Sequence, residues 1–177
     1  MQPHDYSQLT REIYHKQHTA IANDQVAMDR FINMFTYEYF GVDKNFFKEK
    51  KILDAGCGNT AKVIIAMHRL GAQDIHGFDL GHEFIPVATE SLKRQGVPLT
   101  NVSLKSGNLL SIPYPDESFD FVICHGVLLH LNNYEEVRQA FSELARVTKS
   151  GKRERERERE REEVATFILY TELSAVC

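Results

Sequence analysis

The residues best suited to chemistry lie in a glycine turn and at the end of the apolar run that follows it. Residues 54–58 read Asp-Ala-Gly-Cys-Gly and directly follow the apolar pair Ile52 and Leu53, and the later run ends at Asp79. Glycines let backbone approach a ligand closely because they carry no Cβ. An acid at the end of the next strand can accept hydrogen bonds from ribose hydroxyls. The spacing therefore predicts a nucleoside cofactor at one edge of a doubly wound sheet.

Two cofactors compete for this pattern. Gly56, Gly58 and Ala61 fit the G-x-G-x-x-G/A motif of nicotinamide dinucleotide sites, with Asp79 at the ribose position. Asp54 argues against a dinucleotide, because its carboxylate stands where a pyrophosphate would pass, and like charges in a partly buried site repel by about a few kcal/mol. The sulfonium and ammonium of S-adenosylmethionine are attracted to a carboxylate. An NAD-dependent oxidoreductase and a turn that binds no cofactor stay as alternatives.

Residues 54–58 resemble motif I of the class I S-adenosylmethionine-dependent methyltransferases. The resemblance runs from about residue 50 to residue 151. Further motifs follow in the family's order and spacing, namely Ser-Gly-Asn at 106–108, Ile-Pro-Tyr-Pro-Asp at 112–116, the segment 118–124 and the segment 144–151. The chain is thus identified as a member of this family with a methyltransferase type 11-like domain. The resemblance implies an α/β, Rossmann-like, doubly wound fold with a mainly parallel five-stranded sheet and N-terminal helices, lacking the family's last two strands.

The resemblance also implies which residues contact the cofactor. They are Asp54, Gly56, Cys57, Gly58, Asp79, Leu80, Asn108, Leu109 and His125. Asp79 would accept from the ribose, Leu80 would lie against the adenine, and Asn108 would accept from the adenine amino group in place of the family's usual Asp. Thr60 stands where the family most often has a third glycine. For Asp79 and Asn108 the alternative is that strand-end and turn residues satisfy their own backbone.

Methyl transfer is an in-line displacement, so orientation of the acceptor can supply much of the acceleration. His125, just past an expected strand, is the best placed side chain to accept a proton from a hydroxyl or amine. A structural histidine is the alternative reading, and it is favoured more strongly for His130. Tyr14, His15 and His18 belong to helices that in the family tend to cover the acceptor pocket, although a solvated helix face is the simpler reading. The histidines show no metal-type clustering, and we expect no metal.

Composition fits a single cytoplasmic domain. The 177 residues are 42% hydrophobic and 26% charged with a net charge of −4, which gives no reason to expect nucleic acid, and no run is long enough to span a membrane. The three cysteines have no metal-ligand spacing and are expected to be reduced thiols.

The hydrophobic pattern predicts helices at 6–19, 26–40, 60–70, 83–95 and 134–148, and strands at 51–55, 74–79, 102–105 and 119–125.

Arg and Glu alternate from Arg153 to Glu162 within the charged segment 152–163, and this repeat reads as a charge-balanced insertion. The apolar run 165–171 resembles the family's fifth strand, and the sequence ends six residues later. We therefore expect a C-terminally truncated domain that can self-associate through an exposed fifth strand.

The expected organisation is a helical lid at 1–49 and a cofactor-binding domain at 50–177. The expected function is methyl transfer to a small-molecule acceptor, and a non-catalytic binding module is the alternative.

Overall fold

The computed structural model describes residues 24–150 as a parallel sheet between two layers of helices. Its strands are β1 (Lys51–Ala55), β2 (Asp74–Asp79), β3 (Val102–Ser106) and β4 (Phe121–Ile123). They lie in the order β3-β2-β1-β4, and every neighbouring pair is parallel. The chain therefore winds outward from β1 to β3 and then crosses back to the other side of β1. This reversal places a switch point at the carboxyl ends of β1 and β4, where open α/β sheets bind ligands.

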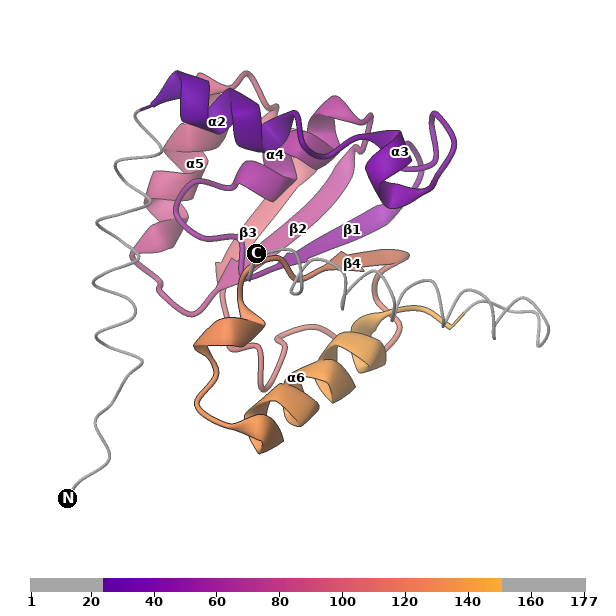
Figure 1. Ribbon diagram of the computed structural model, residues 1–177, viewed down its shortest axis with the longest axis vertical. Helices are drawn as coiled ribbons and strands as arrows, with labels where there is room; N and C mark the ends of the chain where they lie inside the picture. Colours follow the sequence, from indigo (N-terminus) through magenta and orange to yellow (C-terminus); the bar gives the residue numbers. More distant parts are fainter. Residues whose placement is uncertain (1–23, 151–177) are drawn as a thin grey trace.

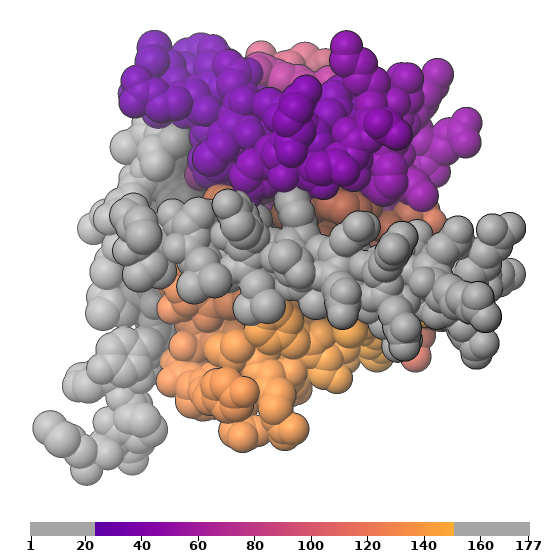
Figure 2. Space-filling model, turned by 45° about the vertical axis from the view of Figure 1, so that its right-hand side comes forward, coloured from indigo at the N-terminus to yellow at the C-terminus, as the bar shows by residue number. Residues whose placement is uncertain are grey.

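The helices cover both faces of this sheet. They are α2 (Gln25–Ile32), α3 (Tyr37–Phe40), α4 (Lys62–Arg69), α5 (Phe84–Arg94) and α6 (Tyr134–Val147), with short 3₁₀ turns at Leu99–Asn101 and Leu128–His130. Figure 1 shows α2, α4 and α5 on one side of the strands and α6 on the other. The space-filling view separates the same two layers, with the indigo atoms of the N-terminal helices above and the orange and yellow atoms of α6 below (Figure 2). The architecture confirms the α/β, Rossmann-like prediction.

Each face of the sheet has its own apolar core. Successive strand residues point to opposite faces. In β1, Ile52 therefore joins the cluster beneath α2, α4 and α5, whereas Leu53 joins the cluster beneath α6. Both side chains are fully buried. A strand covered on both faces can carry consecutive apolar residues, and in β1 these are Ile52 and Leu53.

Most predicted boundaries agree with the structure. The predicted strands at 51–55 and 74–79 are confirmed at both ends. The strand expected at 119–125 is shorter and covers only Phe121–Ile123, because Phe119 pairs with Thr148 in an isolated bridge instead. The expected helix 6–19, the Arg/Glu repeat 152–163 and the expected fifth strand 165–171 lie outside the described residues.

The single helix predicted at 26–40 is wrong, because the chain forms two helices there. α2 ends at the C-cap Asn33, and α3 begins after Thr36, whose backbone is extended and whose hydroxyl accepts a hydrogen bond from the Tyr39 N–H at 3.1 Å. A threonine in this position caps a new helix more favourably than it continues an old one. The break turns α3 away from α2.

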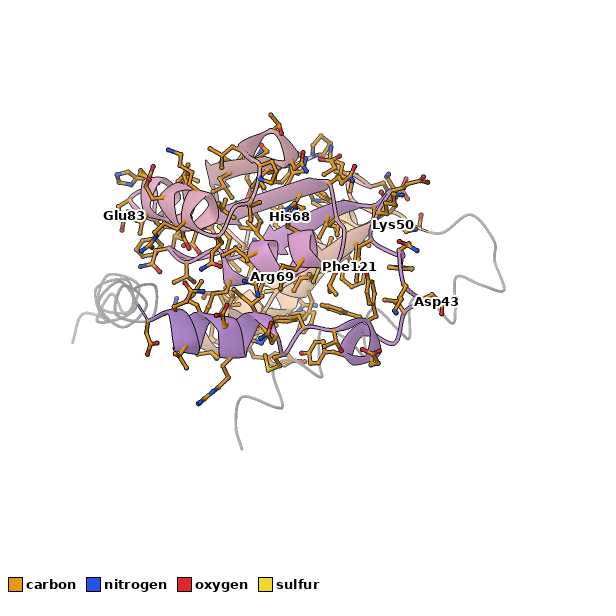
Figure 3. All side chains as sticks on the ribbon, turned by 90° about the horizontal axis from the view of Figure 1, so that it is seen from above. Asp43, Lys50, His68, Arg69, Glu83 and Phe121 are labelled. Carbon is orange, nitrogen blue, oxygen red and sulfur yellow. The ribbon has the colours of Figure 1, made fainter. Side chains whose placement is uncertain are left out.

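α2 is held against the body of the domain by polar contacts at its outer side. Arg69, at the end of α4, donates to Asp29 at 3.3 Å and to Asn33 at 3.4 Å, and Figure 3 shows this side chain between the two helices. Asp24 caps the start of α2 by accepting from the N–H groups of Val26 and Ala27. These contacts fix the helix that carries Phe31. Within the described residues, no helix is long and apolar enough to cross a membrane.

Candidate functional site

A cavity of about 390 Å³ opens at the carboxyl ends of β1, β2 and β4. Small-molecule sites typically occupy about 300 to 1,000 Å³ and favour such switch points. All nine residues predicted to contact a cofactor line this cavity, namely Asp54, Gly56, Cys57, Gly58, Asp79, Leu80, Asn108, Leu109 and His125. The fold therefore brings together residues from four separate segments of the chain.

The glycine turn after β1 lines the cavity. The N–H groups of Gly56 and Cys57 both donate to the carbonyl oxygen of Phe78, at 2.9 and 3.0 Å, which ties the turn to β2. Gly56 has φ +94°, and a Cβ at this position would lie 2.4 Å from Cγ2 of Val127. Both the backbone conformation and the close approach therefore require glycine here.

Asp79 lies at the end of β2 and joins that strand to the glycine turn. Its Oδ2 accepts from the Gly58 N–H at 2.8 Å, and its Oδ1 accepts from the Gly81 N–H at 3.2 Å. Burial raises the pKa of this carboxyl, although the backbone donors oppose the shift. Each oxygen has a second lone pair, so the carboxylate can still accept from ribose hydroxyls. Backbone pairing and ribose binding are thus compatible at Asp79.

Asp54 is the least satisfied polar side chain of the site. It is 1% exposed, and neither of its carboxyl oxygens has a hydrogen-bond partner. Its pKa is raised to about 8, mainly by burial and also by the nearby Asp79, while Lys62 opposes the shift. A buried acceptor without a donor destabilises a protein by about 1 to 3 kcal/mol, and by more when it is charged. A ligand ammonium would supply the missing donor, so this position fits the methionine half of S-adenosylmethionine.

Asn108 belongs to the loop after β3. Its Oδ1 accepts from the Leu110 N–H at 2.8 Å, so the side chain stabilises its own turn. This contact matches the alternative considered for Asn108, while the second lone pair of the amide oxygen remains able to accept from a ligand. Contact with adenine stays a prediction. Gly107, next to it, packs under the ring of Pro113, because a Cβ there would lie 2.6 Å from Cγ of that proline.

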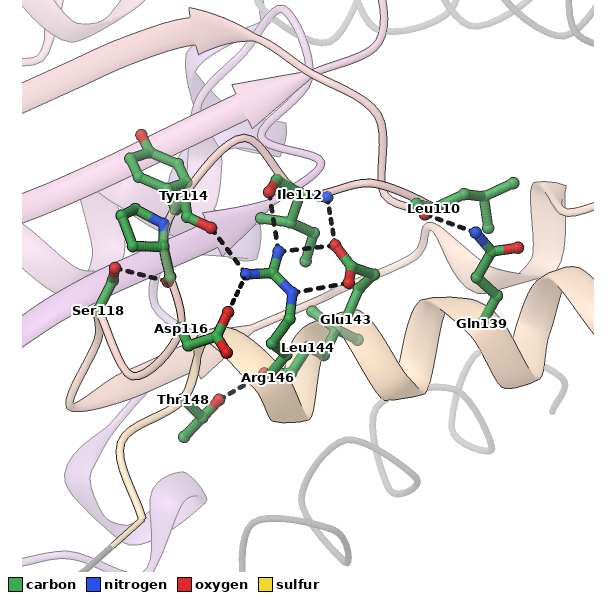
Figure 4. Close-up of polar contacts among 11 residues, drawn as sticks. Leu110, Ile112, Tyr114, Asp116, Ser118, Gln139, Glu143, Leu144, Arg146 and Thr148 are labelled. Atoms are coloured by element: carbon green, nitrogen blue, oxygen red, sulfur yellow. Dashed lines mark hydrogen bonds and ion pairs between the residues drawn. The ribbon is translucent and has the colours of Figure 1, made fainter.

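Arg146 of α6 anchors the loop that carries these residues. Its guanidinium donates to the carbonyl oxygens of Ile112 at 3.0 Å and Tyr114 at 2.9 Å and pairs with Asp116 at 2.7 Å (Figure 4). Glu143, one turn earlier, accepts from the Ile112 N–H and from Arg146, both at 2.7 Å. The loop is thus fixed to α6 on either side of Pro113, the residue that packs against Gly107.

His125 follows β4 and faces the N-terminal helices. Its ring meets Phe31 and Phe35 edge to face, with centroid distances of 5.3 and 5.5 Å. Burial lowers its pKa, and the positive charge of Lys62 lowers it further. Its imidazole is therefore neutral near pH 7 and can accept a proton, as a general base requires. His130 also lines the cavity, and burial lowers its pKa as well.

The sequence did not single out Phe31 and Lys62, which also line the cavity. Lys62 is the first residue of α4, and its Nζ lies 4.0 Å from the centroid of the Phe31 ring. A lysine at the start of an amphipathic helix reads as a solvated residue. Its position directly after the glycine turn was the one available signal.

Comparison with known proteins shows the family to which the chain belongs. The model of the methyltransferase domain family matches residues 53–153, which is more than half of the chain. The demethylmenaquinone methyltransferase of Geobacillus stearothermophilus is 33% identical over 108 residues, which cover 60% of this chain and 44% of the relative. The chain thus spans less than half the length of that curated relative.

Solved structures show the same relationship. The crystal structure of the YcgJ protein from Bacillus subtilis superimposes with a TM-score of 0.53 at 30% identity and covers 65% of this chain and 47% of its own. A SAM-dependent methyltransferase structure from Methanosarcina mazei has a TM-score of 0.53 at 27% identity, with 59% and 50% of the two chains covered.

Proposed function

The chain belongs to the class I S-adenosylmethionine-dependent methyltransferase family, and on this premise we propose that it binds S-adenosylmethionine in the cavity and methylates a small-molecule acceptor. The observation that carries this proposal is the carboxyl of Asp54, which lines the cavity and is buried without a donor. The cofactor's ammonium fits this position, whereas the pyrophosphate of a dinucleotide would be repelled by a charged Asp54.

Different residues of the cavity bind different parts of the cofactor. Asp54 and the turn at Gly56 and Gly58 receive the methionine half, Asp79 accepts from the ribose, and Asn108 and Leu109 border the adenine. When bound, the cofactor supplies a methyl group activated by its sulfonium. The protein holds this group and excludes water from it, because the cavity walls are largely apolar.

The acceptor side of the cavity is shaped by Phe31, His125, Val127, Leu129 and Leu131. Four of these side chains are apolar, which favours a largely apolar acceptor. Neutral His125 is the group that takes a proton if the acceptor is a hydroxyl or an amine. Orientation of the acceptor opposite the sulfonium then contributes up to about 7 to 11 kcal/mol to lowering the barrier.

Methyl transfer is tested with the full chain and methyl-labelled S-adenosylmethionine against a panel of acceptors. Demethylmenaquinone analogues belong in the panel, because a relative bears the name demethylmenaquinone methyltransferase. We expect label in one acceptor class, and less label with Asp79→Ala protein when the cofactor is limiting. Tight binding of S-adenosylhomocysteine without transfer to any acceptor would favour the alternative of a non-catalytic binding module.

A further inference from the structure

Asp54 and Lys62 are an acid and a base that line the same cavity. Each favours the charged form of the other, because Lys62 lowers the pKa of Asp54 and Asp54 raises that of Lys62. Among residues 24–150, however, no ion pair with an N···O distance up to 4.0 Å includes Lys62. The two groups thus interact electrostatically but form no direct ion pair.

Lys62 is held in place by an aromatic ring. Its Nζ lies 4.0 Å from the centroid of Phe31, a residue of α2, and the side chain is partly buried. A cation over a ring face is stabilised electrostatically but keeps its N–H donors. Burial lowers the pKa of Lys62, so a nearby anion would stabilise its charged form. The ammonium is therefore positioned to bind an anionic group of a ligand.

We propose that Lys62 binds the α-carboxylate of the cofactor's methionine half, while Asp54 binds the ammonium on the same carbon. An α-amino acid carries these two charges a few Å apart, which matches an acid and a base that face one cavity without contact. Lys62 would thus select ligands with an intact amino acid. This inference rests on the proposed function and adds a residue that determines cofactor specificity.

The alternative use of Lys62 is to bind an anionic acceptor, and the structure favours it less. An anion from the acceptor would pair with Lys62 but would leave both oxygens of Asp54 without a donor. A zwitterion satisfies both side chains at once. Because paired burial stabilises charges that are costly when isolated, the amino acid is the better occupant.

A series of three ligands isolates this contact. S-adenosylhomocysteine carries the full amino acid, S-adenosyl-3-thiopropylamine keeps the amine but lacks the carboxylate, and 5′-methylthioadenosine lacks both. Calorimetric titration of the full chain and its Lys62→Met variant gives a double-mutant cycle between lysine and carboxylate. We expect the variant to bind S-adenosylhomocysteine roughly ten- to a hundredfold more weakly, as for a lost charged hydrogen bond. The other two ligands should change less than about threefold.

Two further variants serve as controls. Lys62→Arg keeps the charge and should retain most of the affinity for S-adenosylhomocysteine. Lys93→Met removes an exposed lysine of α5, which pairs with Glu90 away from the cavity, and should have no effect on binding. If Lys62→Met unfolds, Lys62→Gln replaces it in the same cycle, and thermal melting reports which variants are folded.

The outcomes separate this inference from the proposed function. Equal affinity of the wild-type and Lys62→Met proteins for S-adenosylhomocysteine overturns the role of Lys62 and leaves the proposed function intact. An equal loss for all three ligands also overturns it, because the lysine would then act on the shape of the whole site. Failure of the wild-type chain to bind any of the three overturns both proposals.

Discussion

The carboxylate of Asp79, at the end of β2, accepts a hydrogen bond of 2.8 Å from the backbone N–H of Gly58, which lies 21 residues earlier in the glycine turn after β1. This bond joins the two segments that sequence reasoning selected for the cofactor. It also orients the carboxylate at the rim of the cavity, where the ribose is expected to bind.

Replacing Asp79 with Ala should weaken binding of S-adenosylhomocysteine by about 1 to 3 kcal/mol, because the ribose hydroxyls lose a charged acceptor. Calorimetric titration measures the change. Asp74→Ala is the matched control, since Asp74 begins the same strand at the opposite edge of the sheet, and its affinity should stay within about twofold of wild type. Equal affinities of the Asp79→Ala variant and the wild type for S-adenosylhomocysteine would show that Asp79 does not bind the ribose.

Sequence reasoning predicted the sheet and most of the site because both depend on local signals. Buried runs mark β1 and β2, and the glycines and acids stand at their ends. It missed the break between α2 and α3, because Phe31, Phe35 and Tyr39 recur at helical spacing. Their rings do contact in succession at 5.3 Å, but Thr36 begins a new helix between them. Lys62 was missed for a different reason, since its contact with Phe31 is a tertiary one that no local pattern indicates.

Gly56→Ala should destabilise the fold more than Gly96→Ala. Both glycines have positive φ, +94° and +71°, so each alanine is strained by about 1 to 2 kcal/mol. At Gly96 a Cβ meets no atom within 4 Å, whereas at Gly56 it would lie 2.4 Å from Val127. The overlap should add about 1 to 3 kcal/mol, measured by urea denaturation.

The source of this extra loss can be checked with a second substitution. Val127→Ala in the Gly56→Ala background removes the overlapping methyl groups and should recover part of the lost stability. If the two glycine variants were equally stable, the turn would not pack against Val127 as the structure has it.

Arg146→Gln should destabilise the protein by about 1 to 3 kcal/mol, because the carbonyls of Ile112 and Tyr114 lose a charged donor. It should also weaken S-adenosylhomocysteine binding, since the loop next to Gly107 loosens. Arg138→Gln on the same helix is the control: that arginine is 74% exposed and pairs only with Glu135 among the contacts found for it, so its loss should change stability by less than about 0.5 kcal/mol. Similar losses for both variants would contradict the anchoring role of Arg146.

Because of Asp54, the free energy of unfolding should fall as the pH rises. Its carboxyl ionises near pH 4 in an unfolded chain and near its raised pKa of about 8 in the folded protein, so the folded state holds one more proton between these values. Asp54→Asn removes this proton difference. We therefore expect the stability of the variant, relative to wild type, to increase by about 1 to 3 kcal/mol between about pH 5 and pH 8, in urea denaturation without ligand.

The neighbours of Asp54 are Asp79 and Lys62, and both remain in the Asp54→Asn protein, so their own titration largely cancels in this comparison. A stability difference that does not vary with pH would mean that Asp54 ionises in the folded protein at its ordinary pKa.

The central claim is that this cavity binds S-adenosylmethionine, and calorimetric titration of the full chain with S-adenosylhomocysteine and with NAD tests it most directly. We predict saturable one-to-one binding of S-adenosylhomocysteine, weakened by Asp79→Ala, and no heat of binding from NAD. Saturable binding of NAD without binding of S-adenosylhomocysteine would contradict it, as would S-adenosylhomocysteine binding that is unaffected by any substitution at Asp54, Lys62 or Asp79.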